Sequence, residues 1–223
     1  MFQQFENKRE AGKQLAEALN DYEGRQDCLI LALPRGGVPV AYEVAKRLSL
    51  PLDVLLVRKL GVPGHEELAM GAIATGGIRV INHNILQQLY LSPAALEQVT
   101  IKEEKELNRR NRLYRGNLPI PDLKRKTIIV VDDGLATGAT MKAAVATLQA
   151  AKANSIIVAV PVGATFTCYE LAELADKVVC LYRPDPFGGV GQWYTDFSQT
   201  SDEEVQQLLA HAKHQPMNEL VNT

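Results

Sequence analysis

The stretch TIIVVDDGLATGAT, residues 127–140, decides the fold class of this 223-residue chain. Its first five residues are apolar or β-branched, which is typical of a strand buried on both faces of a parallel sheet. Two adjacent carboxylates, Asp132 and Asp133, follow directly, and a run of small residues and hydroxyls comes next. Charge at the end of a buried strand is costly unless a ligand or partner compensates it. The stretch therefore predicts a strand, a ligand-binding turn and a helix, in that order.

The same strand pattern recurs along the chain, with helical patterns between the runs. Further apolar runs lie at 28–33, 52–57, 155–162 and 177–182, and helical patterns at 38–48, 139–152 and 167–175. Strands that alternate with helices require crossover connections and a sheet covered on both faces. We expect an α/β fold in one domain, residues 1–223, with a mainly parallel central sheet flanked by helices. Ligands of such sheets bind at the carboxyl ends of the strands.

Three segments interrupt this rhythm. Residues 61–82 are glycine-rich, which predicts a flexible loop or hairpin beside the site. Residues 92–115 predict an inserted charged helix, whose Glu106 is spaced to pair with Arg109 and Arg110. This helix is interpreted as a solvated or subunit-contacting surface, with a basic patch for nucleic acid as the alternative. Residues 183–223 predict a small hood and a C-terminal helix.

Composition excludes several classes of protein. The 24 basic and 26 acidic residues nearly balance, so the overall charge gives no sign of a nucleic-acid or membrane partner. The N-terminus is polar, and no run reaches the roughly 18 apolar residues that a membrane-spanning helix needs. The three cysteines occur singly, which is typical of buried thiols in a reducing compartment. We expect a soluble cytoplasmic protein.

The turn after the acid pair has the composition of a phosphate cradle. It comprises Gly134, Leu135, Ala136, Thr137, Gly138, Ala139 and Thr140. Small residues let backbone amides approach a ligand, the threonines offer hydroxyl donors, and the following helix begins with a positive end. Carboxylates beside a phosphate fit a sugar phosphate, because the vicinal hydroxyls of a ribose are donors. A Walker loop needs lysine where this turn has Ala139, and a tight turn with a helix cap is the plainer alternative.

Residues 128–140, IIVVDDGLATGAT, resemble the signature by which type I phosphoribosyltransferases bind phosphoribosyl pyrophosphate (PRPP). The order of elements is similar over residues 28–197. The resemblance implies that Asp132 and Asp133 are catalytic acids that hold the ribose hydroxyls. It also implies that residues 134–140 hold the 5′-phosphate. Mg²⁺ is the expected cofactor, bound to substrate oxygens mostly through water and with few protein ligands.

Two basic segments are candidates for the pyrophosphate end of this substrate. Arg35, Gly36 and Gly37 follow the first strand, where a guanidinium and exposed amides can hold phosphate oxygens. Arg58 and Lys59 follow the run 52–57, where similar enzymes place a basic residue against pyrophosphate, and either of the two is the candidate.

The glycine-rich segment after these basic residues resembles in position the mobile loop that closes over the active site in this family. It contains His65, Glu66 and Glu67, which are either proton-transfer groups or exposed loop residues.

The acceptor side of the reaction is carried by aromatic residues after the last strand. Phe187, Trp193 and Tyr194 either stack on a planar base or form a small core. The residues Phe187, Val190, Gly191, Asp196 and Phe197 echo the hood of purine-salvage members, with spacing that departs by at least one residue. A purine base is thus one acceptor, and a non-nucleobase acceptor stays open.

We expect an enzyme, a Mg²⁺-dependent phosphoribosyltransferase that moves ribose 5-phosphate from PRPP to a nitrogenous acceptor with release of pyrophosphate. The expected partners are PRPP and a small-molecule acceptor, with a homodimer as the assembly and neither nucleic acid nor a membrane. The alternatives are a non-catalytic sensor or regulator that binds PRPP or a nucleotide, and a phosphohydrolase that acts on a ribose phosphate.

Overall fold

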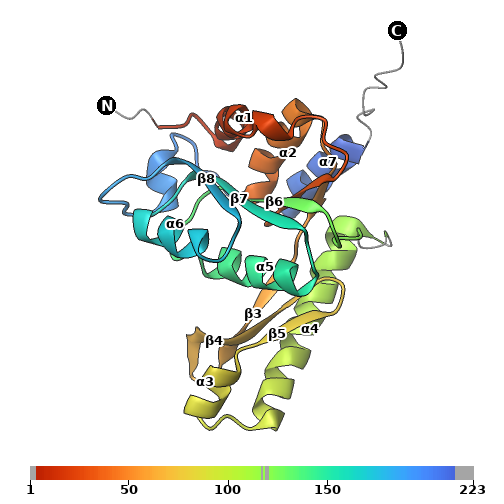
Figure 1. Ribbon diagram of the computed structural model, residues 1–223, viewed down its shortest axis with the longest axis vertical. Helices are drawn as coiled ribbons and strands as arrows, with labels where there is room; N and C mark the ends of the chain where they lie inside the picture. The colour runs from red at the N-terminus through yellow and green to blue at the C-terminus, as the bar shows by residue number, and fades with distance from the viewer. Residues whose placement is uncertain (1–3, 117, 119–120, 214–223) are drawn as a thin grey trace.

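The computed structural model describes residues 4–116, 118 and 121–213, apart from the side chain of Glu67. Its centre is a five-stranded sheet in the order β2-β1-β6-β7-β8, in which every neighbouring pair is parallel (Figure 1). The strands are β1 (Cys28–Ala32), β2 (Leu52–Val54), β6 (Thr127–Val131), β7 (Ser155–Val162) and β8 (Lys177–Tyr182). The sheet confirms the predicted α/β class.

Helices cover both faces of this sheet. On one face lie α1 (Lys8–Ala18), α2 (Gly37–Leu48) and α7 (Asp202–Lys213), and on the other lie α5 (Ala139–Ala150) and α6 (Thr165–Ala172). Ile30 of β1 packs with the first group and Leu31 with the second, because successive side chains of a strand point to opposite faces. This explains why the central strands are continuous apolar runs. Short 3-10 turns occur at Asn20–Tyr22 and Val190–Trp193.

The run 52–57 is divided between two sheets, which corrects its prediction as one strand. β2 ends at Val54, and β3 (Val57–Val62) begins a separate antiparallel sheet with β4 (His65–Ala74) and β5 (Ile78–Ile81). The glycine-rich segment 61–82 is therefore largely hairpin strands. Arg58 and Lys59 lie within β3, not at the carboxyl end of a parallel strand.

The charged helix of residues 92–115 is α4 (Pro93–Arg115), which follows the short helix α3 (His83–Gln88). Ser92 caps it, because its hydroxyl accepts a hydrogen bond from the amide of Ala95. α4 packs on β3 and β4 and also on α7, and it buries Leu107 and Tyr114. The predicted pairing of Glu106 with Arg109 and Arg110 is confirmed. A different face of α4 lies against both the small sheet and the main body (Figure 1).

The predicted C-terminal segment 183–223 is described only to residue 213, so 214–223 lies outside the described residues. Within the described part of the chain, no helix has the length and apolar character needed to cross a membrane.

Candidate active site

The turn after β6 is held by backbone hydrogen bonds to the end of β7. The amide of Leu135 donates to the carbonyl oxygen of Val162 at 2.9 Å, and the carbonyl oxygen of Leu135 accepts from the amide of Ala164 at 2.9 Å. The hydroxyl of Thr167 donates to the carbonyl oxygen of Ala136 at 2.6 Å. The turn is therefore shaped in advance of any ligand, with α5 beginning directly after Gly138.

Two glycines of the turn have no room for a side chain. A Cβ atom on Gly134 would lie 2.5 Å from Cγ1 of Val190, and one on Gly138 would lie 2.5 Å from Cγ2 of Thr167. Gly138 also has a φ of +68°, which side chains disfavour. The small residues of the turn thus serve close packing as well as access for a ligand.

The acid pair lies half-buried at the carboxyl end of β6. The amide of Asp133 donates to Oδ1 of Asp132 at 2.9 Å. Burial raises the pKa of Asp133 to about 6, against a smaller opposing effect of the nearby charge of Lys8. Burial and the neighbouring Asp133 carboxylate raise the pKa of Asp132 as well. The raised pKa values show that burial destabilises the charged form of both carboxylates. Hydrogen-bond donors on a ligand would stabilise that charged form.

The turn after β1 lies directly against this acid pair. A Cβ atom on Gly37 would lie 2.6 Å from the carbonyl oxygen of Val131 and 2.9 Å from Cα of Asp132, and one on Gly36 would overlap the carboxylate of Asp133. β1 and β6 are neighbours in the sheet, and their parallel pairing places both turns at the same edge. The peptide bond between Pro34 and Arg35 is cis. The structure thus brings together two segments that are about 100 residues apart in sequence.

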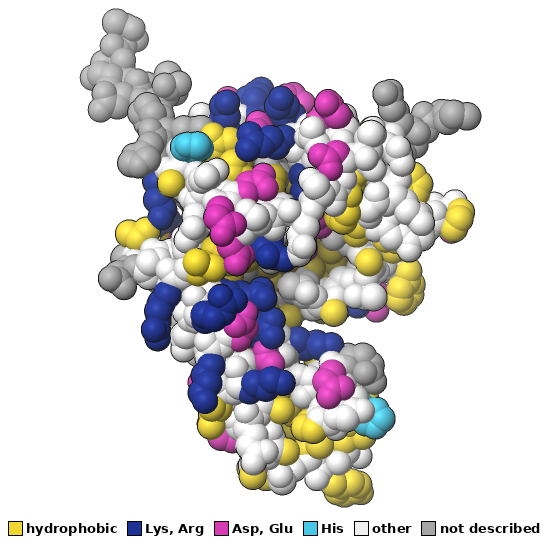
Figure 2. All heavy atoms as spheres, turned by 180° about the vertical axis from the view of Figure 1, so that it is seen from behind, with side chains coloured by type: hydrophobic (Ala, Val, Ile, Leu, Met, Phe, Trp, Pro, Cys, Tyr) yellow, Lys and Arg dark blue, Asp and Glu magenta, His cyan; other side chains and the backbone are white. Residues whose placement is uncertain are grey.

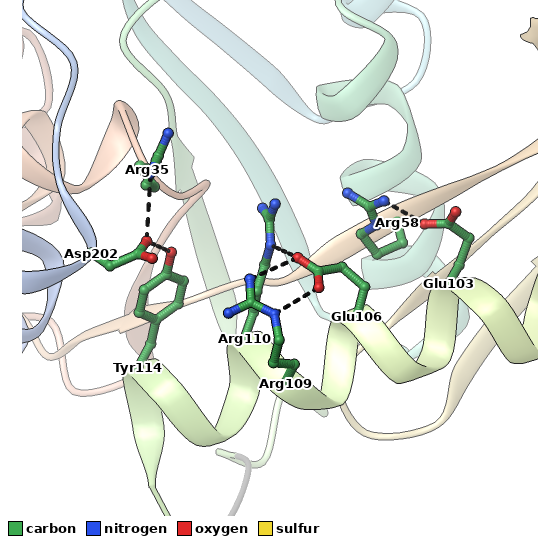
Figure 3. A network of polar contacts seen from close by, with 8 residues as sticks. All are labelled: Arg35, Arg58, Glu103, Glu106, Arg109, Arg110, Tyr114 and Asp202. Carbon is green, nitrogen blue, oxygen red and sulfur yellow. Dashed lines mark hydrogen bonds and ion pairs between the residues drawn. The ribbon is translucent and has the colours of Figure 1, made fainter.

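The expected basic residues Arg35 and Arg58 have carboxylate partners. Nη1 of Arg35 lies 3.7 Å from Oδ1 of Asp202, at the start of α7. Nε and Nη2 of Arg58 lie 2.6 and 2.5 Å from Oε2 of Glu103, on α4 (Figure 3). Lys59, the third expected basic residue, lines two cavities. Both cavities border the turn of residues 134–140, here called the phosphate turn after its expected ligand.

Both cavities lie between the small sheet and the turn. One of about 450 Å³ is lined by Arg58, Lys59, Glu66 and Thr140, among others. The other, of about 660 Å³, is bordered by Thr137, Ala139 and the small sheet. Glu66 therefore faces a cavity beside the turn, His65 is exposed, and the side chain of Glu67 lies outside what the structure describes. Figure 2 shows the face of the molecule that is turned away from the viewer in Figure 1. In the half that contains α4 and the small sheet, basic and acidic side chains are intermixed on this face.

The three predicted aromatic residues pack on one small cluster, in which Tyr194 is buried and Phe187 and Trp193 are partly buried. Tyr194 is buried, its ring centroid lies 5.5 Å from that of Phe5, and its hydroxyl donates to the carbonyl oxygen of Asp133 at 2.6 Å. Nε1 of Trp193 donates to the carbonyl oxygen of Phe187 at 2.9 Å, and both side chains pack on the same cluster. Tyr194 thus belongs to a small core, whereas for the partly buried Phe187 and Trp193 both interpretations stay open. Tyr194 holds the backbone of the acid pair, a role that sequence reasoning missed.

Comparison with known proteins places the chain in a family. The family model of the phosphoribosyl transferase domain matches residues 2–192, so the chain belongs to that family and the predicted resemblance is confirmed. The crystal structure of TT1426 from Thermus thermophilus is similar, with a TM-score of 0.85 and 40% identity. That similarity covers 93% of this chain and 98% of the Thermus chain.

Curated relatives come from two strains of Mycobacterium tuberculosis, each provisionally named a phosphoribosyl transferase. They are 48% identical to this chain over 209 residues, which is 93% of this chain. The matched region is 47% of each relative, so the chain spans about half the length of these relatives.

Proposed function

We propose that the chain is a Mg²⁺-dependent phosphoribosyltransferase, which transfers ribose 5-phosphate from PRPP to a nitrogenous acceptor and releases pyrophosphate. One observation carries this proposal: the Arg35–Gly37 turn lies against Asp132 and Asp133, beside the phosphate turn. The three segments that would recognise PRPP are therefore adjacent. Membership of the phosphoribosyl transferase domain family supports the same conclusion.

The turn and the acid pair would bind the ribose 5-phosphate part. Backbone amides and the hydroxyls of Thr137 and Thr140 would hold the phosphate at the positive end of α5. The carboxylates of Asp132 and Asp133 would accept hydrogen bonds from the ribose hydroxyls. These contacts hold the anomeric carbon in place, and such positioning supplies much of the rate enhancement.

The Arg35–Gly37 turn, with Arg58 and Lys59, would bind the pyrophosphate. The bond from the anomeric carbon to pyrophosphate breaks, and pyrophosphate leaves with the electron pair. A bond then forms between that carbon and the acceptor nitrogen, which loses its proton. Glu66 is our candidate for the proton acceptor, because it lines the cavity that Arg58 and Thr140 share. Guanidinium and ammonium groups stabilise the charge that develops on the leaving group.

We propose that a magnesium ion would reach this site on the phosphate oxygens of the substrate. Among the residues that the structure describes, no group of three or more His, Cys, Asp or Glu side chains could hold a metal ion. Mg²⁺ keeps several water ligands and binds phosphate oxygens in such sites. Its contribution when bound is to neutralise the pyrophosphate charge.

A panel of nucleobases and amines with PRPP tests the proposal, with pyrophosphate release and product mass as the measurements. A Mg²⁺-dependent product whose mass is that of the acceptor plus phosphoribosyl supports it. A purine base is the first acceptor to test. Tight PRPP binding without turnover across the panel would instead identify a sensor. The packing of the hood aromatics on the cluster around Phe5 favours that alternative function. Release of inorganic phosphate without an acceptor would identify a hydrolase.

A further inference from the structure

Helix α4 supplies carboxylates and guanidinium groups that border the expected pyrophosphate site. Figure 3 shows Glu103, Glu106, Arg109, Arg110 and Tyr114, all on α4, in three neighbouring groups of polar contacts. Asp202 from α7 accepts from the hydroxyl of Tyr114 at 2.5 Å and also pairs with Arg35. The helix therefore contacts two of the expected substrate-binding arginines, Arg58 directly through Glu103 and Arg35 indirectly through Asp202.

Charge is not balanced across these contacts. The four guanidinium groups, of Arg35, Arg58, Arg109 and Arg110, face three carboxylates, those of Glu103, Glu106 and Asp202. Arg35 and Arg58 each have one carboxylate partner, so the surplus positive charge arises where two arginines share Glu106. One of these two guanidinium groups is therefore available to an anionic ligand at low cost.

The two arginines use Glu106 differently. Arg109 engages both carboxylate oxygens, with Nε at 2.8 Å from Oε2 and Nη2 at 3.0 Å from Oε1. Arg110 donates to Oε1 through Nε, at 2.7 Å. Hydrogen bonds from Arg109 and Arg110 lower the pKa of Glu106 to about 2, so it stays ionised near neutral pH. Arg109 alone can satisfy Glu106, whereas the terminal nitrogens of Arg110 extend away from α4, on the side where Arg35 and Arg58 lie (Figure 3).

Arg110 borders the substrate turns directly. A notch of about 20 Å³ has three polar lining residues, Arg58, Arg110 and Thr140. The rest of its lining is apolar and comprises Leu33, Pro34, Leu55, Leu56, Val57 and Leu107. It shares Val57, Arg58 and Thr140 with the cavity of about 450 Å³ beside the phosphate turn. A volume of that size holds about one water-sized atom group. The notch suits one phosphate oxygen, and the larger cavity suits the rest of the group.

We propose that Arg110 binds the pyrophosphate group of PRPP and of the released product. The inference rests on the proposed function and adds a binding residue that neither turn contains. The terminal nitrogens of Arg110 would donate to a phosphate oxygen in the notch, while Arg109 keeps Glu106 compensated.

Calorimetric titration of Arg110→Gln, with Arg109→Gln as the matched control, tests this role. Both variants remove one partner of Glu106, but only Arg110 lines the notch. The ligands are PRPP, pyrophosphate and ribose 5-phosphate, each with Mg²⁺. Arg110→Gln should weaken binding of PRPP and pyrophosphate about tenfold or more, because a hydrogen bond to a charged group is lost. Its affinity for ribose 5-phosphate should match that of the unchanged protein, and Arg110→Lys should restore part of the loss.

Three results would overturn the inference. Equal affinities of the two glutamine variants for pyrophosphate would remove any special role of Arg110. A matching loss of ribose 5-phosphate binding in Arg110→Gln would show a structural fault of the whole site. Failure of the unchanged protein to bind PRPP would overturn the proposed function, and this inference with it.

Discussion

The hydroxyl of Tyr194 donates a 2.6 Å hydrogen bond to the backbone carbonyl oxygen of Asp133. Burial raises the pKa of this phenol, so it stays protonated and remains a donor. The bond joins the hood to the turn that carries the acid pair, across 61 positions of sequence.

Replacement of Tyr194 by Phe tests this link. The variant leaves a half-buried carbonyl oxygen without its donor, which should lower the free energy of unfolding by about 1–2 kcal/mol. PRPP affinity should fall with it, because the Asp133 backbone is less firmly held. Urea denaturation and calorimetric titration measure the two effects. Unchanged values in both would show that the hood does not support the turn.

Gly36→Ala tests the contact between the two turns. The new methyl group would overlap the Asp133 carboxylate, so one turn must move. We expect PRPP affinity to fall at least about tenfold, because the two turns would no longer be positioned to contact the same substrate molecule. Gly189→Ala is the matched control, because a Cβ atom there meets nothing within 4 Å. Equal PRPP affinity of the two variants would contradict the arrangement.

The raised pKa of Asp133 predicts how stability depends on pH. Its folded pKa of about 6 lies above the value of about 3.9 that an unfolded chain has. The folded state therefore binds this proton more tightly, and the resulting stability is fully present below about pH 4 and lost as pH rises through about 6.

The unliganded protein should thus lose part of its unfolding free energy between about pH 4 and pH 7 through this carboxyl group. Asp133→Asn should lose less over the same range, because it has no group to ionise. Urea denaturation at a series of pH values gives the difference between the two proteins. That difference includes the titration of Asp133 and the change in the titration of Asp132 when its charged neighbour is removed. Parallel curves would mean that the carboxyl is not destabilised by burial.

The ion pair between Arg115 of α4 and Asp53 of β2 allows a change in protein stability to be tested apart from a change in PRPP binding. Nη2 of Arg115 lies 3.2 Å from Oδ2 of Asp53, and the Arg115 side chain is only 3% exposed. Arg115→Gln leaves a largely buried carboxylate without its charged partner, which should lower the unfolding free energy by about 3 kcal/mol. PRPP affinity of the folded fraction should stay unchanged, because this pair lies outside the proposed site. A parallel loss of PRPP affinity would contradict that separation.

Local sequence was enough to predict the main sheet and the phosphate turn. Residues 127–140 hold strand, acids, turn and helix start in one continuous segment, so no long-range contact was needed to recognise them. The break within 52–57 could not be predicted, because Leu55 and Leu56 are buried and apolar while the backbone passes from one sheet to another. Hydrophobicity carries no signal of that change.

The hydrogen bond of Tyr194 and the proposed role of Arg110 depend on tertiary contacts that sequence spacing does not reveal. Tyr194 meets Phe5 and Asp133, which lie far from it in the chain. Arg110 reaches the notch because α4 packs on β3 and thereby lies beside Pro34 and Arg58. Its helix has the charge pattern of an ordinary solvated surface, which concealed its position.

The central claim is that one turn binds a ribose 5-phosphate, with carboxylates on the sugar hydroxyls and amides on the phosphate. Calorimetric titration of PRPP with Mg²⁺ into the double variant Asp132→Asn, Asp133→Asn tests it most directly. The account predicts that PRPP binding is lost while the variant keeps its circular dichroism spectrum and unfolds at no lower denaturant concentration than the unchanged protein. PRPP affinity equal to that of the unchanged protein would contradict the account.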